Sequence, residues 1–207
     1  MSSKLTVEQR IQKDHVWLMK NPKYCLYSGI MMLGKTVVDD DTPTACTNGR
    51  DTWYGRAFTD KLSDKERRAV ILHENLHKAF RHTTVWKHLY KDWPQMANIA
   101  CDFVINILIH DSDPQGTDVA LPKSAMLDFK FRGLDAGEVF RRLKQEADNK
   151  NSVHIKTAGD QQGKDIPIDR SGGGPEGLDE HDWESACLLY TSPSPRDYAA
   201  SRMPSSA

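Results

Sequence analysis

The strongest constraint on the fold of this chain is a helix predicted over residues 67–81, which carries two histidines four positions apart. Ser63 and Glu66 form a capping-box pattern, in which the Ser hydroxyl and the Glu carboxylate satisfy free backbone amides, so we expect the helix to begin there. The stretch has no Gly or Pro, and residues 69–72 at its centre are continuously apolar. This pattern predicts a buried helix, which needs a core around it.

The spacing of the two histidines predicts a metal site. Residues at positions i and i+4 lie on one face of a helix, so His73 and His77 can bind one zinc ion. Glu74 lies beside them, where it can hold a metal-bound water and accept its proton. The alternative is two partly exposed histidines on a charged surface, and the apolar residues just before them argue against it. A His-Glu-x-x-His helix is typical of zinc metallopeptidases.

A catalytic zinc needs a third protein ligand and one open position, and Asp102 is the preferred candidate. A second apolar helix is predicted from Pro94 to about His110, and Asn98, Asp102 and Asn106 form a polar stripe along it. A buried carboxylate is costly unless something compensates its charge, and a metal would do so. We therefore expect Asp102 to be a ligand, with Asn98 and Asn106 holding the ligands or orienting substrate. The alternative that Asp102 and Asn106 cap or bridge backbone stays open.

Three other residues are weaker candidates for the site. His82 is a weak alternative ligand, because its position five residues after His77 rotates it off the shared face. A place at the end of the helix would suit its imidazole equally well. His88 lies in a Lys- and Trp-rich stretch typical of a surface. Tyr54 could donate to a developing oxyanion from an edge strand beside the helix, or it could simply be a hairpin aromatic.

The remaining pattern indicates an α+β fold in which the histidine helix packs with the second buried helix against a small sheet. Residues 5–20 predict an amphipathic helix, and residues 24–38 predict strand with turns. Asn48-Gly49 is a hairpin turn signal. Residues 134–146 predict a further amphipathic helix.

Charge and cysteine content exclude some classes of protein. There are 28 Lys and Arg against 29 Asp and Glu, so a nucleic-acid or membrane-surface partner is not expected. No stretch resembles a signal peptide or a membrane span. The four cysteines lack the spacing of a disulfide framework or a zinc knuckle. We therefore expect a soluble, reduced, cytoplasmic protein.

Three segments are expected along the chain. Residues 1–150 form the domain, and residues 151–186 form a Gly-rich polar linker. Residues 187–207 resemble the translation of a transposase-based sequencing adapter, so we expect that they are not native and that a C-terminal domain is missing.

Several segments together resemble one known family. Residues 44–50 (TACTNGR), 72–82 (LHENLHKAFRH), 98–106 (NIACDFVIN) and 134–140 (LDAGEVF) are similar to the metallopeptidase domain found N-terminal to von Willebrand factor A-like domains in bacteria and phages. The resemblance implies a zincin-like fold, His73 and His77 as zinc ligands, Glu74 as catalytic residue and Asp102 as a further ligand. It also implies that the missing C-terminal part is an A-like domain.

Two functions fit these observations. The first is hydrolysis of peptide bonds in a peptide or protein substrate, with a zinc-bound water activated by Glu74. The alternative is a non-catalytic, metal-stabilised interaction module that presents an A-like domain to partners. A metal saturated by four protein ligands would favour the module.

Overall fold

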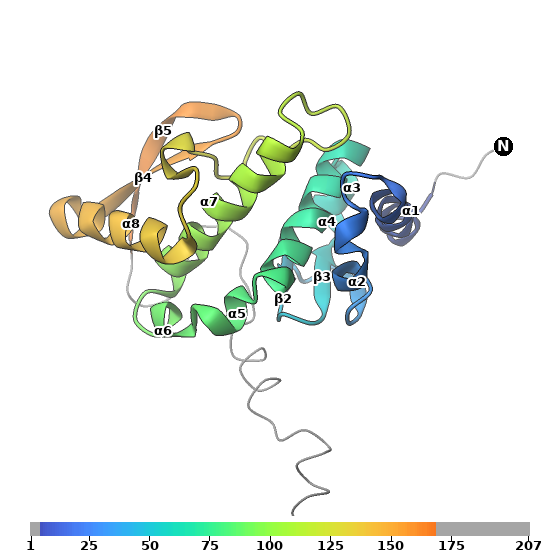
Figure 1. Cartoon of the computed structure of the whole chain (residues 1–207), viewed down its shortest axis with the longest axis horizontal. Coiled ribbons are helices and arrows are strands. Elements are labelled where there is room, and N and C mark those ends of the chain that lie inside the picture. Colours follow the sequence, from blue (N-terminus) through green and yellow to red (C-terminus); the bar gives the residue numbers. More distant parts are fainter. Residues whose placement is uncertain (1–4, 169–207) are drawn as a thin grey trace, which may run out of the picture.

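Two long helices form the centre of the molecule and position the site. The computed structural model describes residues 5–168. Helix α4 (Asp64–Ala79) and helix α7 (Pro94–Ser112) lie side by side, with the N-terminal helices and a small sheet on one flank and the C-terminal elements on the other (Figure 1). Helices and small sheets are combined in one unit, so the predicted α+β class is confirmed.

Helix α4 begins at the predicted capping box. The Ser63 hydroxyl accepts a hydrogen bond from the Glu66 backbone amide at 3.3 Å, and the Glu66 carboxylate accepts one from the Ser63 amide at 3.0 Å. The helix ends at Phe80, and Arg81 then takes a left-handed backbone conformation with φ 54°. That turn redirects the chain into the short helices α5 (His82–Val85) and α6 (Lys87–Tyr90).

Helix α7 is buried on nearly all sides, as its composition predicts. Pro94 occupies its first turn, where a missing amide hydrogen costs nothing. Ile99 and Phe103 belong to a core shared with the C-terminal elements, whereas Ile105 and Ile109 belong to a core shared with α4 and the N-terminal elements. The helix is therefore shared by both cores. Within residues 5–168, no helix combines the length and apolar character that crossing a bilayer requires.

The small sheet contains the predicted hairpin. Strands β2 (Ala45–Thr47) and β3 (Thr52–Gly55) are antiparallel, and β1 (Thr36–Asp39) pairs with β3 in parallel, giving the order β1-β3-β2. The Asn48 side chain accepts hydrogen bonds from the amides of Arg50 and Asp51, which closes the turn. Gly49 has φ 88°, a conformation that glycine adopts without strain.

The N-terminal region agrees with the prediction only in part. Helix α1 (Val7–Lys20) is the predicted amphipathic helix, and it ends at Asn21 before the proline. Residues 25–31 were expected to contribute strand, but they form a 3₁₀ turn (Cys25–Tyr27) and the short helix α2 (Ser28–Met31). Met31 is buried in the core that includes residues of α1 and α4, and Tyr27 packs against that core, so tertiary contacts override local propensity. A further short helix, α3 (Arg56–Lys61), follows β3.

The predicted linker is wrong over its first part. After a 3₁₀ turn (Phe129–Phe131) and helix α8 (Ala136–Lys150), strands β4 (Ser152–Thr157) and β5 (Asp160–Pro167) form an antiparallel hairpin. Val153 and Ile155 point into the core, while β5 is almost entirely exposed. Because only one face of β4 is buried, most residues of the hairpin are polar. The composition of this segment therefore resembles that of a linker. Residues 169–186, and the adapter-like residues 187–207, lie outside the described residues.

Candidate metal centre

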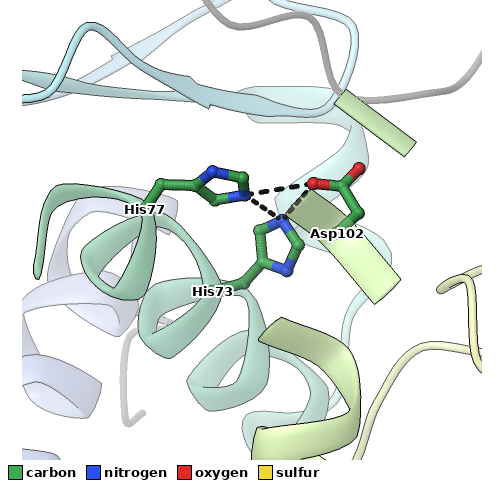
Figure 2. Close-up of side chains that lie close together, drawn as sticks. All are labelled: His73, His77 and Asp102. Atoms are coloured by element: carbon green, nitrogen blue, oxygen red, sulfur yellow. Dashed lines mark hydrogen bonds and ion pairs between the residues drawn. The ribbon is translucent and has the colours of Figure 1, made fainter. Parts of the chain in front are cut away.

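Three side chains from the two central helices converge on one point. His73 and His77 come from successive turns of α4, and Asp102 faces them from α7 (Figure 2). The two Nε2 atoms are 3.0 Å apart, and the Asp102 Oδ1 atom lies 3.1 Å from His77 Nε2 and 3.4 Å from His73 Nε2. All three residues are buried. The structure thus brings together the two histidines and the aspartate singled out in the sequence.

The three atoms have the chemistry and the spacing that a divalent metal requires. Imidazole nitrogen and carboxylate oxygen are common zinc ligands, and ligand atoms about 2.0–2.2 Å from a tetrahedral zinc stand about 3.3–3.6 Å apart. The separations of 3.0–3.4 Å are close to that value. His73, His77 and Asp102 form a group that could hold a metal ion.

Asn106 holds His73 in the orientation that a ligand needs. Its amide nitrogen donates to the Met126 carbonyl at 2.9 Å, so its Oδ1 atom faces His73 as an acceptor. The His73 Nδ1 atom lies 2.9 Å from that oxygen and therefore donates its hydrogen there. In the neutral ring the lone pair is then on Nε2, which points at His77 and Asp102. Hydrogen bonds of this kind set the tautomer and direction of metal-binding histidines.

His82 contacts His77 in the way that Asn106 contacts His73, at the Nδ1 atom of the ring. The Nδ1 atoms of the two rings are 3.2 Å apart, and the rings meet edge to face. His82 is buried at the start of α5, where the left-handed Arg81 turns the chain back toward α4. Within residues 5–168 it is not a member of the group that could hold a metal, but it contacts the far nitrogen of one member.

Asn98 completes the polar stripe of α7. Its side-chain nitrogen lies 3.4 Å from Asp102 Oδ2, the carboxylate oxygen other than the one near the histidines. The stripe therefore faces α4 as a unit, and Asn106 contacts His73 from the same face. Both asparagines lie next to the proposed ligands.

Glu74, which follows His73 in α4, is completely buried. Its charge interacts with two neighbours, Tyr54 on the sheet and Lys78 one helical turn further on. Burial lowers the pKa of Lys78 to about 8, although the nearby carboxylates of Glu74 and Asp51 oppose this shift. The Lys78 ammonium donates to the Leu33 carbonyl at 3.3 Å, which anchors α4 to the loop after α2.

Tyr54 does not lie on an edge strand. It sits in β3, the central strand of the sheet, and only 1% of its surface is exposed. Burial and the adjacent Glu74 charge raise the pKa of its hydroxyl well above the usual value. The edge strand that packs on α4 is β2. The predicted placement of Tyr54 is therefore wrong, because β1 covers the side of β3 that the sequence left open.

A cleft opens next to the metal-ligand group. His73, Asp102 and Asn106 form part of its wall, α3 and α4 contribute apolar residues, and residues of the loop from Leu121 to Met126 complete the lining. That loop received no functional role from the sequence, since its apolar residues carry no motif.

The contact between His82 and His77 was also not predicted from the sequence, because in a continuous helix residues five positions apart lie on different faces. His88 is exposed.

A comparison with known protein families agrees with a metal-binding role for this group. The model of a family described as "Putative metallopeptidase domain" matches residues 18–186. This range includes the hairpin, the small sheet and both helices of the metal-ligand group. No curated protein and no solved structure matches the chain.

Proposed function

The chain belongs to this metallopeptidase-domain family, and on that premise we propose that it is a zinc-dependent, zincin-like peptidase. The observation that carries the proposal is the convergence of His73, His77 and Asp102 from two buried helices on one point beside a cleft. Family membership supports a metal-dependent peptidase, and the ligand chemistry supports zinc in particular.

In this proposal each ligand is held by a second residue. Asn106 fixes the ring of His73, His82 contacts the far nitrogen of His77, and Asn98 approaches the outer oxygen of Asp102. Such support keeps the three ligand atoms together at little entropic cost when a metal binds. A zinc ion bound there would act as a Lewis acid, which polarises the scissile carbonyl and makes water nucleophilic at neutral pH.

Glu74 is the proposed general base. It follows His73 directly in α4, and its carboxylate accepts the proton of the attacking water and passes it to the leaving amine. Burial excludes bulk water from this carboxylate, which strengthens its electrostatic action on a nearby charge. The buried phenol of Tyr54 lies near this carboxylate and can steady it, but among the described residues Tyr54 is not part of the cleft lining.

The non-catalytic module is less well supported. A metal that only stabilises a fold is normally saturated by four protein ligands, whereas a catalytic zinc keeps one position open. Within residues 5–168 the group has three members, and two of them line the cleft. A three-ligand group next to a cleft favours catalysis over a purely structural role.

The experiment compares metal content and hydrolysis in the same preparations. We expect about one zinc per chain by mass spectrometry, greatly reduced in Asp102→Asn, which preserves shape but removes the negative charge. Glu74→Gln should keep the zinc and lower peptide hydrolysis by about 100-fold or more, since a general base contributes about that factor. Glu138→Gln makes the same chemical change at a half-buried position on α8, outside the metal-ligand group, and serves as the control.

Two results would overturn the proposal. Absence of bound metal in the wild-type chain would leave the histidine helix with a structural role only. Full hydrolytic activity in Glu74→Gln, with zinc retained, would exclude the proposed base.

A further inference from the structure

The cleft beside the metal-ligand group has a distinctive lining. Most of its wall is apolar and comes from α3, α4 and the loop at residues 121–126; these residues are Phe58, Ala69, Val70, Leu121, Pro122, Ala125 and Met126. Thr44 and Ser124 add two uncharged polar groups. The surface next to the metal centre is thus mainly hydrocarbon.

The titratable groups that line the cleft belong to the metal-ligand group. Among its lining residues the titratable ones are His73 and Asp102, and both belong to the metal-ligand group. A charged substrate side chain entering the apolar part would lose its hydration, and the titratable lining residues, His73 and Asp102, would be engaged with the metal. An apolar side chain would instead exchange water contacts for contacts with Phe58, Val70 and Met126, which is favourable.

The position of the cleft suits part of an extended peptide. Thr44 lines it and directly precedes β2, one of the two edge strands of the sheet. Because His73 and Asp102 line the same cleft, a side chain held there would lie next to the bond presented to the metal.

We propose that this cleft is a specificity pocket that accepts an uncharged, apolar side chain of the peptide substrate next to the scissile bond. The inference rests on the proposed function, because it treats the group of His73, His77 and Asp102 as the reaction centre. It adds the class of substrate: peptides with an aliphatic or similarly apolar residue at the cleavage site.

The test uses small metal-binding probes, so it does not require a known substrate. The N-acetylated hydroxamates of leucine, aspartate and lysine present the same chelating group with different side chains, and acetohydroxamate has no side chain. Their dissociation constants for the zinc-loaded full chain are measured by calorimetry. We expect the leucine probe to bind about 10-fold or more tightly than either charged probe, the scale on which apolar pockets discriminate.

A pair of variants locates the effect. Ala125 is half-buried and lines the cleft, and its backbone contacts do not involve its side chain, so Ala125→Lys should fold. It introduces a counterion and should tighten binding of the aspartate probe several-fold while weakening that of the leucine probe. Ala57→Lys adds the same charge at an exposed position of α3 that does not line the cleft, and should leave the order of affinities unchanged.

The outcomes separate the two proposals. Equal binding of all side-chain probes, or preference for a charged one, overturns the apolar pocket and leaves the metal centre intact. An unchanged order in Ala125→Lys overturns it as well. Failure of every probe, acetohydroxamate included, would instead mean that no accessible metal is present, and then the proposed function falls together with this inference.

Discussion

The Nδ1 atom of His77 lies 3.2 Å from the Nδ1 atom of His82, and the two rings meet nearly at right angles. If His77 binds a metal through Nε2, its Nδ1 atom carries the hydrogen and donates it to His82. His82 therefore orients the ring of His77, a proposed metal ligand.

This contact predicts opposite behaviour for two substitutions of His82. His82→Leu removes the acceptor and should weaken zinc binding about 10- to 100-fold, the usual effect of losing such a partner. His82→Asn places an amide oxygen near the position of Nδ1 and should retain most of the affinity. Competition with a chromogenic zinc chelator measures both. Equal loss in the two variants would indicate that His82 acts only by packing.

Asn106 should matter for both the metal centre and the fold. Its amide bridges the His73 ring and the Met126 carbonyl, so Asn106→Leu leaves both without this partner. We expect weaker zinc binding and, in the metal-free protein, a loss of about 1–3 kcal/mol in the free energy of unfolding. Urea denaturation in the presence of a chelator measures the second effect. An unchanged unfolding midpoint would contradict the bridging role.

Asp14 should be a major determinant of stability away from the site. It is fully buried and accepts hydrogen bonds from Arg67 at 2.6 Å and from Arg68 at 3.2 Å, which ties α1 to α4. Asp14→Ala leaves the buried Arg67 guanidinium without this carboxylate and should cost about 3–5 kcal/mol. Lys13→Ala removes the adjacent exposed pair with Asp64 and should cost less than about 1 kcal/mol. Similar costs for both variants in urea denaturation would refute the distinction.

His15 should make stability depend on pH. Burial lowers the pKa of its imidazole below the usual 6.5, and its Nδ1 atom lies 3.0 Å from the Ile11 carbonyl. The unfolded chain therefore binds a proton at a higher pH than the folded chain does. Stability from this group is complete above about pH 6.5 and declines as the pH falls toward the lower folded-state value. His15→Gln should flatten the profile of unfolding free energy between pH 5 and 7 relative to wild type, and an identical slope would count against this assignment.

Local sequence determined the elements whose signals involve near neighbours. The capping box at Ser63 and Glu66, the Asn48-Gly49 turn and the first-turn Pro94 each act within a few residues, and the structure contains all three as predicted. The pairing of His73 with His77 follows in the same way from the period of one helix. The polar stripe of α7 also indicated which face of that helix would need a polar partner.

Tertiary structure decided the features that depend on which surfaces meet. Residues 25–31 are helical because they pack on α1 and α4, and β4 is a strand because one of its faces covers the second core. Tyr54 became central only when β1 paired with β3. The left-handed Arg81 brought His82 back to His77, and the loop at residues 121–126 supplied part of the cleft wall. The period of apolar residues in the sequence indicates which face of a helix or strand is buried. It does not indicate which distant segment covers that face, because this depends on the packing of the whole chain.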